Sequence, residues 1–256
     1  MLLRDCLNEL RVNLLHDRSD RIDGSADDTL WSDDTLIRYI DEAQRKLARE
    51  AFVIRDGSTP AVTQVTLVAG QAQYQLHEAV LAVISARYDT DTPDLVRVGH
   101  WFVGGFRMPD PNVFDINQVY TLTPGRPVAY STDTEVVNDD YDSAGVPTLR
   151  VFPTPTANEA GKIIYLRVIR KPIERLSAKM LKVSPEVGED YHFEMLDWAA
   201  YLALRIQDQD AGNRAAAADF EARFNALLKR AQRTAMRKLF APSGWGFGQA
   251  GFTWAR

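Results

Sequence analysis

The sequence contains a single cysteine, Cys6, which excludes an internal disulfide. It has no apolar run near the roughly 20 residues that cross a bilayer, and charges interrupt its N-terminus where a secretory signal would be apolar. These absences predict a protein that is made and assembled in a reducing cytoplasm, with no membrane partner. Because Cys6 falls on the apolar side of a predicted helix, we expect its thiol to be buried and unreactive.

Motifs for catalysis, nucleotide binding and metal binding are also absent. The four histidines are His16, His77, His100 and His192. None has the spacing of a zinc site, and His192 is expected on a surface helix, where Asp190 and Glu194 point away from it. The sequence has no phosphate-binding loop, dinucleotide fingerprint or nucleophile elbow. We therefore expect no enzyme, and no catalytic residue, cofactor or metal.

Basic residues are in the minority. The chain has 35 acidic and 30 basic side chains, a net charge of −5. A dedicated DNA-binding protein usually presents a basic surface, so this balance argues against that class. With 256 residues, 45% of them hydrophobic, the chain is long enough for a sizeable core in one or two domains.

Helical periodicity marks the N-terminal part of the chain. The first predicted helix covers residues 1–17, with an apolar face of Leu3, Leu7, Leu10 and Leu14. After an aspartate-rich loop over 17–28, a second helix is predicted up to residue 51. Ser32 is a good N-cap for it, and Asp33 and Asp34 complement the helix dipole. Its apolar face holds Leu36, Ile40, Ala43 and Leu47, and Trp31 can pack on its first turn.

Two further helices are predicted near the C-terminus. The first begins at Pro185 and has an apolar face of Phe193, Leu196, Ala200 and Leu204. The segment 210–213 is expected to end it. The next helix has an apolar face of Phe220, Phe224, Leu227 and Ala231.

Between the helical segments, strand patterns and prolines dominate. Strands are predicted at 62–68, 74–76, 80–88, 96–103, 118–123, 127–131, 148–152 and 162–169. Nine of the twelve prolines fall between Pro60 and Pro155, which suits short antiparallel strands joined by turns. The predicted fold is α+β, a four-helix terminal bundle with an inserted antiparallel β-rich module. The expected domains are 1–56 with 173–240 (bundle), 57–172 (β-rich module) and 241–256 (C-terminal tail).

The tail is rich in glycine and aromatic residues. Its large aromatic side chains are Trp245, Phe247, Phe252 and Trp254. Glycine is costly to order, yet four aromatics in water would form an adhesive patch. Docking on another subunit or protein would bury the aromatic side chains and offset the cost of ordering the glycines. We therefore expect the tail to become ordered on such a partner. Folding back onto the chain's own β-rich module is the alternative.

A basic stretch over 223–238 contains no acidic residue. At helical spacing, its arginines form a stripe of Arg223, Arg230, Arg233 and Arg237. This stripe fits an acidic partner surface or the phosphates of passing DNA. A solvated helix face with a basic C-terminal end explains it equally well.

The second helix also carries an ordered set of residues: Trp31-Ser32-Asp33, Leu36, Tyr39-Ile40 and Glu42-Ala43. This set resembles the second helix of the head-to-tail adaptor proteins of tailed bacteriophages. Four later segments resemble that family in the same order: YQL at 74–76 with 80–84, GRPVAY at 125–130, PTLRVFPTP at 147–155 and LRVIRKP at 166–172. The resemblance covers about residues 30–235 and leaves out the aromatic tail.

The resemblance implies a structural virion protein that forms a ring below the portal, commonly of twelve identical copies. Such a ring extends the DNA channel and provides the tail attachment site. Its partners would be the portal protein, a tail or nozzle protein, and passing double-stranded DNA that is not bound tightly. A second class of function stays open: a phage tail-associated β-module protein that binds carbohydrate or acts as an enzyme, with Trp101, Phe102 and Phe106 stacking on sugars.

Overall fold

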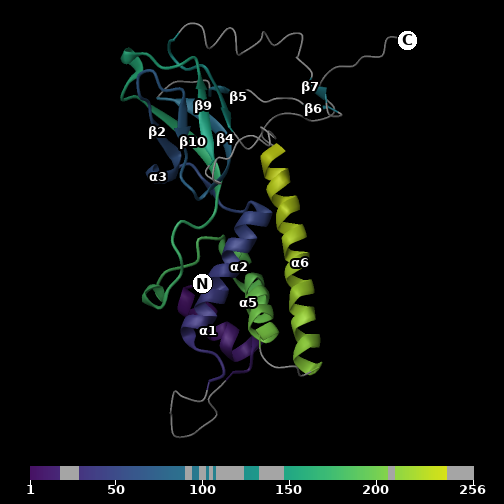
Figure 1. Ribbon diagram of the computed structural model, residues 1–256. Helices are drawn as coiled ribbons and strands as arrows, with labels where there is room; N and C mark the ends of the chain where they lie inside the picture. The colour runs from purple at the N-terminus through teal and green to yellow at the C-terminus, as the bar shows by residue number, and fades with distance from the viewer. Residues whose placement is uncertain are drawn as a thin grey trace, which may run out of the picture. The chain divides into compact units, whose positions relative to one another are not determined.

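The chain divides into two compact units (Figure 1). The computed structural model describes residues 1–17, 29–89, 94–97, 102–103, 106–107, 124–132, 147–206 and 211–240. The helical unit consists of Met1–Ile54 and Pro172–Arg256, and the β-rich unit of Arg55–Lys171. The fold is α+β, as the sequence predicts, because helices from both ends of the chain enclose the strands in sequence.

The helical unit contains α1 (Leu3–Glu9), a π-helical turn (Leu10–Leu14), α2 (Asp33–Ala51), α5 (His192–Ile206) and α6 (Ala211–Phe240). Two 3-10 turns, Ala178–Met180 and Glu189–Tyr191, precede α5. The N-cap predicted for α2 is confirmed, since the Ser32 hydroxyl accepts a hydrogen bond from the Thr35 N–H at 3.3 Å. Within the described residues, no helix has the length and apolar character of a bilayer-spanning segment.

One hydrophobic core of the described residues takes in side chains of α1, the π-helical turn, α2, α5 and α6. Its α2 members include Leu36, Ile40, Ala43 and Leu47, which are fully buried as predicted. Cys6 of α1 belongs to the same core, and burial raises the pKa of its thiol to about 11. The thiol is therefore protonated at neutral pH and is a poor nucleophile.

We expect Ile40→Ala to destabilise the protein by about 2–5 kcal/mol, because it leaves a cavity at a fully buried position. Urea unfolding followed by circular dichroism measures this loss. Glu42→Ala, at an exposed position of the same helix, is the matched control and should change stability by less than about 0.5 kcal/mol. Equal unfolding midpoints for the Ile40 variant and the wild type would contradict the buried face.

The start of α5 differs from the sequence-based expectation. The helix begins at His192 rather than near Pro185. The backbone before His192 makes a hydrogen bond to another helix, since the Glu186 N–H donates to Gln44 Oε1 of α2 at 3.3 Å. His192 is 1% exposed, not on a surface helix, and its Nε2 lies 2.8 Å from the Val187 carbonyl oxygen.

Phe193 is a second correction in α5. The sequence places it on the buried face with Leu196 and Ala200, but it is 61% exposed while those two are fully buried. The helical period fixes the direction of a side chain around the helix axis, not whether a neighbouring element covers that turn. The following helix, α6, begins at Ala211, inside the segment that was expected to be a break.

The first sheet of the β-rich unit is built around β10 (Ile163–Arg170). β4 (Val80–Tyr88) pairs with one edge of β10, and β1 (Arg55–Asp56) and β2 (Gln64–Thr66) pair with the other, all antiparallel. Alternate residues of β10, Ile164, Leu166 and Val168, are buried, as expected when one face of a strand packs on a core.

The second sheet has the order β3 (Gln73–Gln75), β9 (Thr148–Phe152), β8 (Ala129–Thr132) and β5 (Val96–Arg97). Every described strand pair is antiparallel except β5 with β8, which is parallel and corrects the all-antiparallel expectation. A parallel pair needs a long connection, which residues 98–128 supply. That connection includes a small pair of strands, β6 (Phe102–Val103) and β7 (Phe106–Arg107).

Two of the predicted strands are not observed over their full predicted ranges. Residues 60–63, partly inside the strand predicted over 62–68, form the short helix α3 (Pro60–Thr63). Proline suits the first turn of a helix, because its fixed φ angle and missing N–H cost nothing there. The strand predicted over 118–123 lies outside the described residues.

Candidate functional site

The long helix α6 carries the basic stretch that the sequence singles out. Its predicted apolar face is buried, with Phe224, Leu227 and Ala231 in the core of the helical unit. Burial of this face leaves the other sides of the helix in water. The four arginines of the predicted stripe are all exposed: Arg223, Arg230, Arg233 and Arg237.

These arginines do not act as one stripe. Arg223 pairs with Asp219, one turn earlier on α6, and Arg230 pairs with Glu194 on α5. Exposed pairs of this kind contribute only about 0–1 kcal/mol to stability, but they neutralise their charges locally. The part of the stripe nearer the start of α6 therefore serves the helical unit itself.

The remaining charges form what we call the α6 cationic face: Lys229, Arg233 and Arg237. Across the described ranges, none of these three has a carboxylate partner. A hollow with a volume of about 400 Å³ opens here, and its lining includes the three cations and Gln232. The Gln232 amide donates to the carbonyl oxygen of Glu50 at 2.9 Å, which fixes the face beside the end of α2.

A half-buried carboxylate, Asp197, lies in α5 near the paired arginines. Burial raises its pKa to about 6; the charge of Arg223 opposes this shift, and the carboxylates of Glu194 and Asp219 add to it. The helical unit therefore contains an acid whose ionisation at neutral pH disfavours the folded state.

We expect Asp197→Asn to stabilise the protein by about 1 kcal/mol near neutral pH, after a discount for partial exposure. The folded-state pKa is raised, so the folded wild type binds the proton more tightly than the unfolded chain does. The free energy of unfolding of the wild type therefore falls, relative to that of Asp197→Asn, as the pH rises from about 4 through about 6. Melting temperatures of both proteins measured across this range should coincide at about pH 4 and diverge above about pH 6. Asp190→Asn, at an exposed position, controls for the change in net charge.

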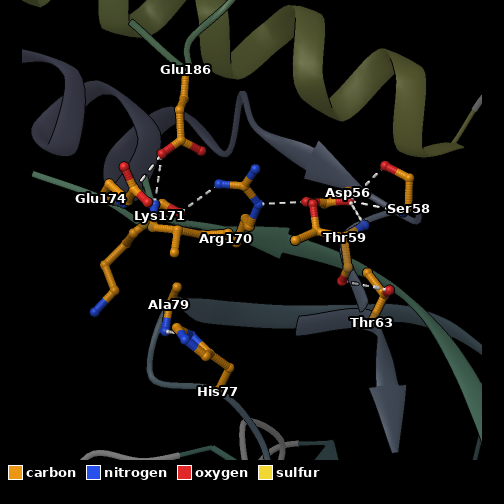
Figure 2. A network of polar contacts seen from close by, with 11 residues as sticks. Asp56, Ser58, Thr59, Thr63, His77, Ala79, Arg170, Lys171, Glu174 and Glu186 are labelled. Atoms are coloured by element: carbon orange, nitrogen blue, oxygen red, sulfur yellow. Dashed lines mark hydrogen bonds and ion pairs between the residues drawn. The ribbon is translucent and has the colours of Figure 1, made fainter. Parts of the chain in front are cut away.

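The β-rich unit has a polar network at the point where the chain enters and leaves it (Figure 2). Arg55 of β1 lies opposite Ile169 of β10, so the entering and leaving segments are neighbours in this unit. Arg170 Nε donates to Asp56 Oδ2 at 2.7 Å, and neither residue is more than 9% exposed. A buried ion pair thus holds the two segments together.

Asp56 also organises the turn that follows it, as Figure 2 shows. Its Oδ1 accepts hydrogen bonds from the backbone N–H groups of Ser58 at 2.8 Å and Thr59 at 3.0 Å. Burial opposes ionisation of Asp56, but the hydrogen bonds from Thr59, Ser58 and Arg170 hold its pKa well below its ordinary value. One carboxylate therefore serves both the turn that follows β1 and the ion pair with Arg170.

Several sequence-based candidates fall outside what the structure describes. The four tail aromatics and Trp101 lie beyond the described residues, and of Phe102 and Phe106 only the backbone is described. In the described part of the chain, no group of three or more His, Cys, Asp or Glu residues is placed to hold a metal ion. The α6 cationic face and the Asp56–Arg170 pair are the features that sequence periodicity alone did not resolve.

Comparison with known proteins agrees with the resemblance seen in the sequence. The family described as SU10 adaptor protein matches residues 13–244. No curated protein matches the sequence. The family match takes in α2, α5, α6 and the whole β-rich unit, which is most of the chain. The chain therefore belongs to the SU10 adaptor protein family, a family of phage head-to-tail adaptors, and is a phage structural protein.

Proposed function

We propose that the protein forms a ring below the portal of a tailed phage, extends the DNA channel and provides the tail attachment site. The family match over residues 13–244 is the observation that supports this most directly. Identical subunits that make head-to-tail contacts close into a ring when the rotation between neighbours is right. We propose twelve copies per ring, in contact with the portal protein on one side and a tail or nozzle protein on the other.

The charge of the chain supports a channel that lets DNA slide. Each phosphate that a protein neutralises adds salt-dependent affinity, so a tightly gripping lumen would hinder passage. The net charge is −5, and the α6 cationic face contributes only three uncompensated positive charges. We therefore propose weak or no binding of the free protein to duplex DNA at physiological salt. A tight, salt-sensitive complex in a gel-shift assay would instead indicate a DNA-binding factor.

We propose that the tail aromatics make the contact with the portal or with a neighbouring subunit. Their alternation with glycines gives apolar anchors on a segment whose ordering without a partner is costly. The protein would then act in the virion, at the head-tail connector, after assembly in the host cytoplasm.

Deletion of the gene tests the proposed function. We expect electron microscopy of particles without this protein to show heads, filled or leaking, that lack tails, because the attachment site is missing. Supplying the wild-type protein in trans should restore tailed particles and is the control. Normal tailed particles from the deletion would contradict an adaptor role and reopen the carbohydrate-binding or enzymatic alternative.

A further inference from the structure

We infer that the α6 cationic face binds the acidic first turn of α2 in a second copy of the chain. This inference rests on the proposed ring and names the surfaces that join its subunits. The acidic turn is formed by Asp33 and Asp34, which are both exposed.

The described residues supply no carboxylate partner for the three side chains of the α6 cationic face. Lys229, Arg233 and Arg237 follow one another at intervals of four residues, so they line one side of the helix and repel each other. Arg223 and Arg230 of the same helix are each neutralised by a carboxylate. The described residues supply none for the three cations, so an acidic surface from outside the chain is their natural complement.

A second copy is such a surface. Without the cationic face, the chain retains 27 basic and 35 acidic side chains, a net charge of −8. The acidic turn begins five residues after the aspartate-rich sequence 17–28. Within the described residues, Asp34 has no ion pair, while Asp33 already pairs with Arg11 at 2.6 Å.

The acidic turn and the cationic face of one copy lie too far apart to neutralise each other. Gln232 ties the cationic face to Glu50, at the C-terminal end of α2, whereas the acidic turn is at its N-terminal end. The 19 residues of α2 span about 28 Å, which is well beyond the Debye length of about 8 Å at physiological salt. Opposite charges at the two ends favour a head-to-tail contact between copies.

Exposed apolar side chains accompany the charges at both ends of α2. Leu30, just before the acidic turn, is 66% exposed, and Phe52, just after the helix, is 39% exposed. Phe52 has φ 55° and ψ 39°, a left-handed conformation that glycine adopts at lower cost. The phenylalanine at this glycine-like position therefore adds exposed apolar surface that the local backbone geometry does not require. Apolar contacts also fit a protein surface better than the phosphates of a DNA duplex.

Cross-linking in assembled particles tests the inference. We would build virions whose only copy of the protein carries both Asp34→Cys and Arg233→Cys, and treat them with a short bifunctional maleimide. The two introduced thiols should join each copy to the next, which gives a ladder of covalent multimers on a denaturing gel. The single variants are the controls and should give no ladder, because Cys6 is buried.

The outcomes separate the inference from the proposed function. Tailed particles without a ladder, or with links to the portal instead, would overturn the contact and leave the ring in place. Absence of any oligomer in virions would overturn the ring itself. The protein could instead shift duplex DNA in a gel, and Arg233→Glu could abolish that shift. DNA would then be the ligand of the α6 cationic face, and the proposed contact between copies would be overturned.

A charge swap gives an independent test. We expect Arg233→Glu to lower the yield of tailed particles about tenfold or more, because like charges then face each other. Combining it with Asp34→Arg should restore most of the yield. Arg214→Glu makes the same change of charge at an exposed position near the start of α6 and should have little effect. Failure of the combined variant to recover would count against Asp34 as the partner.

Discussion

Replacing Asp56 with alanine is expected to destabilise the β-rich unit by about 3–5 kcal/mol, because it breaks a buried ion pair by removing the carboxylate that faces the Arg170 guanidinium. The same change removes the acceptor for the N–H groups of Ser58 and Thr59. Urea unfolding of the full-length protein measures the loss. An unchanged midpoint would show that the ion pair contributes nothing to folding.

Asp56→Asn separates the two roles of this carboxylate. Asparagine keeps an oxygen for the turn but loses the charge that pairs with Arg170, so it should recover part of the stability that alanine loses. The contribution of the wild-type charge also depends on pH. Because the folded-state pKa of Asp56 is depressed, this contribution is complete above about pH 4 and is lost as the pH falls toward the folded value. The stability difference between wild type and Asp56→Asn should shrink accordingly in acid.

Truncation after Ala241 is expected to abolish attachment to the head while it leaves the melting temperature nearly unchanged. The cut falls just beyond α6, which ends at Phe240, and all the described members of the helical core lie before it. Ordering a tail costs about 1–2 kcal/mol per residue, and each buried aromatic returns roughly 1.5–3 kcal/mol. Binding of the truncated protein to purified portals, measured by co-sedimentation, tests this expectation.

A full-length tail without aromatic side chains is the matched control for the truncation. It carries serine at the four aromatic positions: Trp245, Phe247, Phe252 and Trp254. If the aromatic side chains are the anchors, this variant should fail to bind portals as completely as the truncated protein does. Binding of either protein at wild-type strength would show that the anchor lies elsewhere.

The second helix shows how far local sequence can carry a prediction. The N-cap Ser32, the acidic first turn and the four predicted apolar positions of α2 are as expected, because capping and helical period depend on residues within a few positions of one another. The family resemblance was visible for a similar reason, since it rests on short ordered motifs. The α+β class follows from the change of period on either side of the β-rich unit.

Other features depended on partners that are distant in the sequence. Phe193 has the right helical phase for burial, yet it is exposed because no described element covers its side chain. Arg230 looks like part of a basic stripe, yet Glu194, 36 residues earlier, neutralises it. The pairing of Asp56 with Arg170 spans 114 positions and has no local signal.

Local sequence therefore predicts the helices, most of the strands, the α+β class and the adaptor family, because periodicity, capping and ordered motifs are properties of neighbouring residues. The tertiary structure alone decided which arginines of α6 are neutralised, that β5 and β8 run parallel, and that one buried carboxylate joins the entry and exit of the β-rich unit. Burial and ion pairing depend on what packs against a side chain, and that neighbour is fixed only when segments far apart in the chain come together.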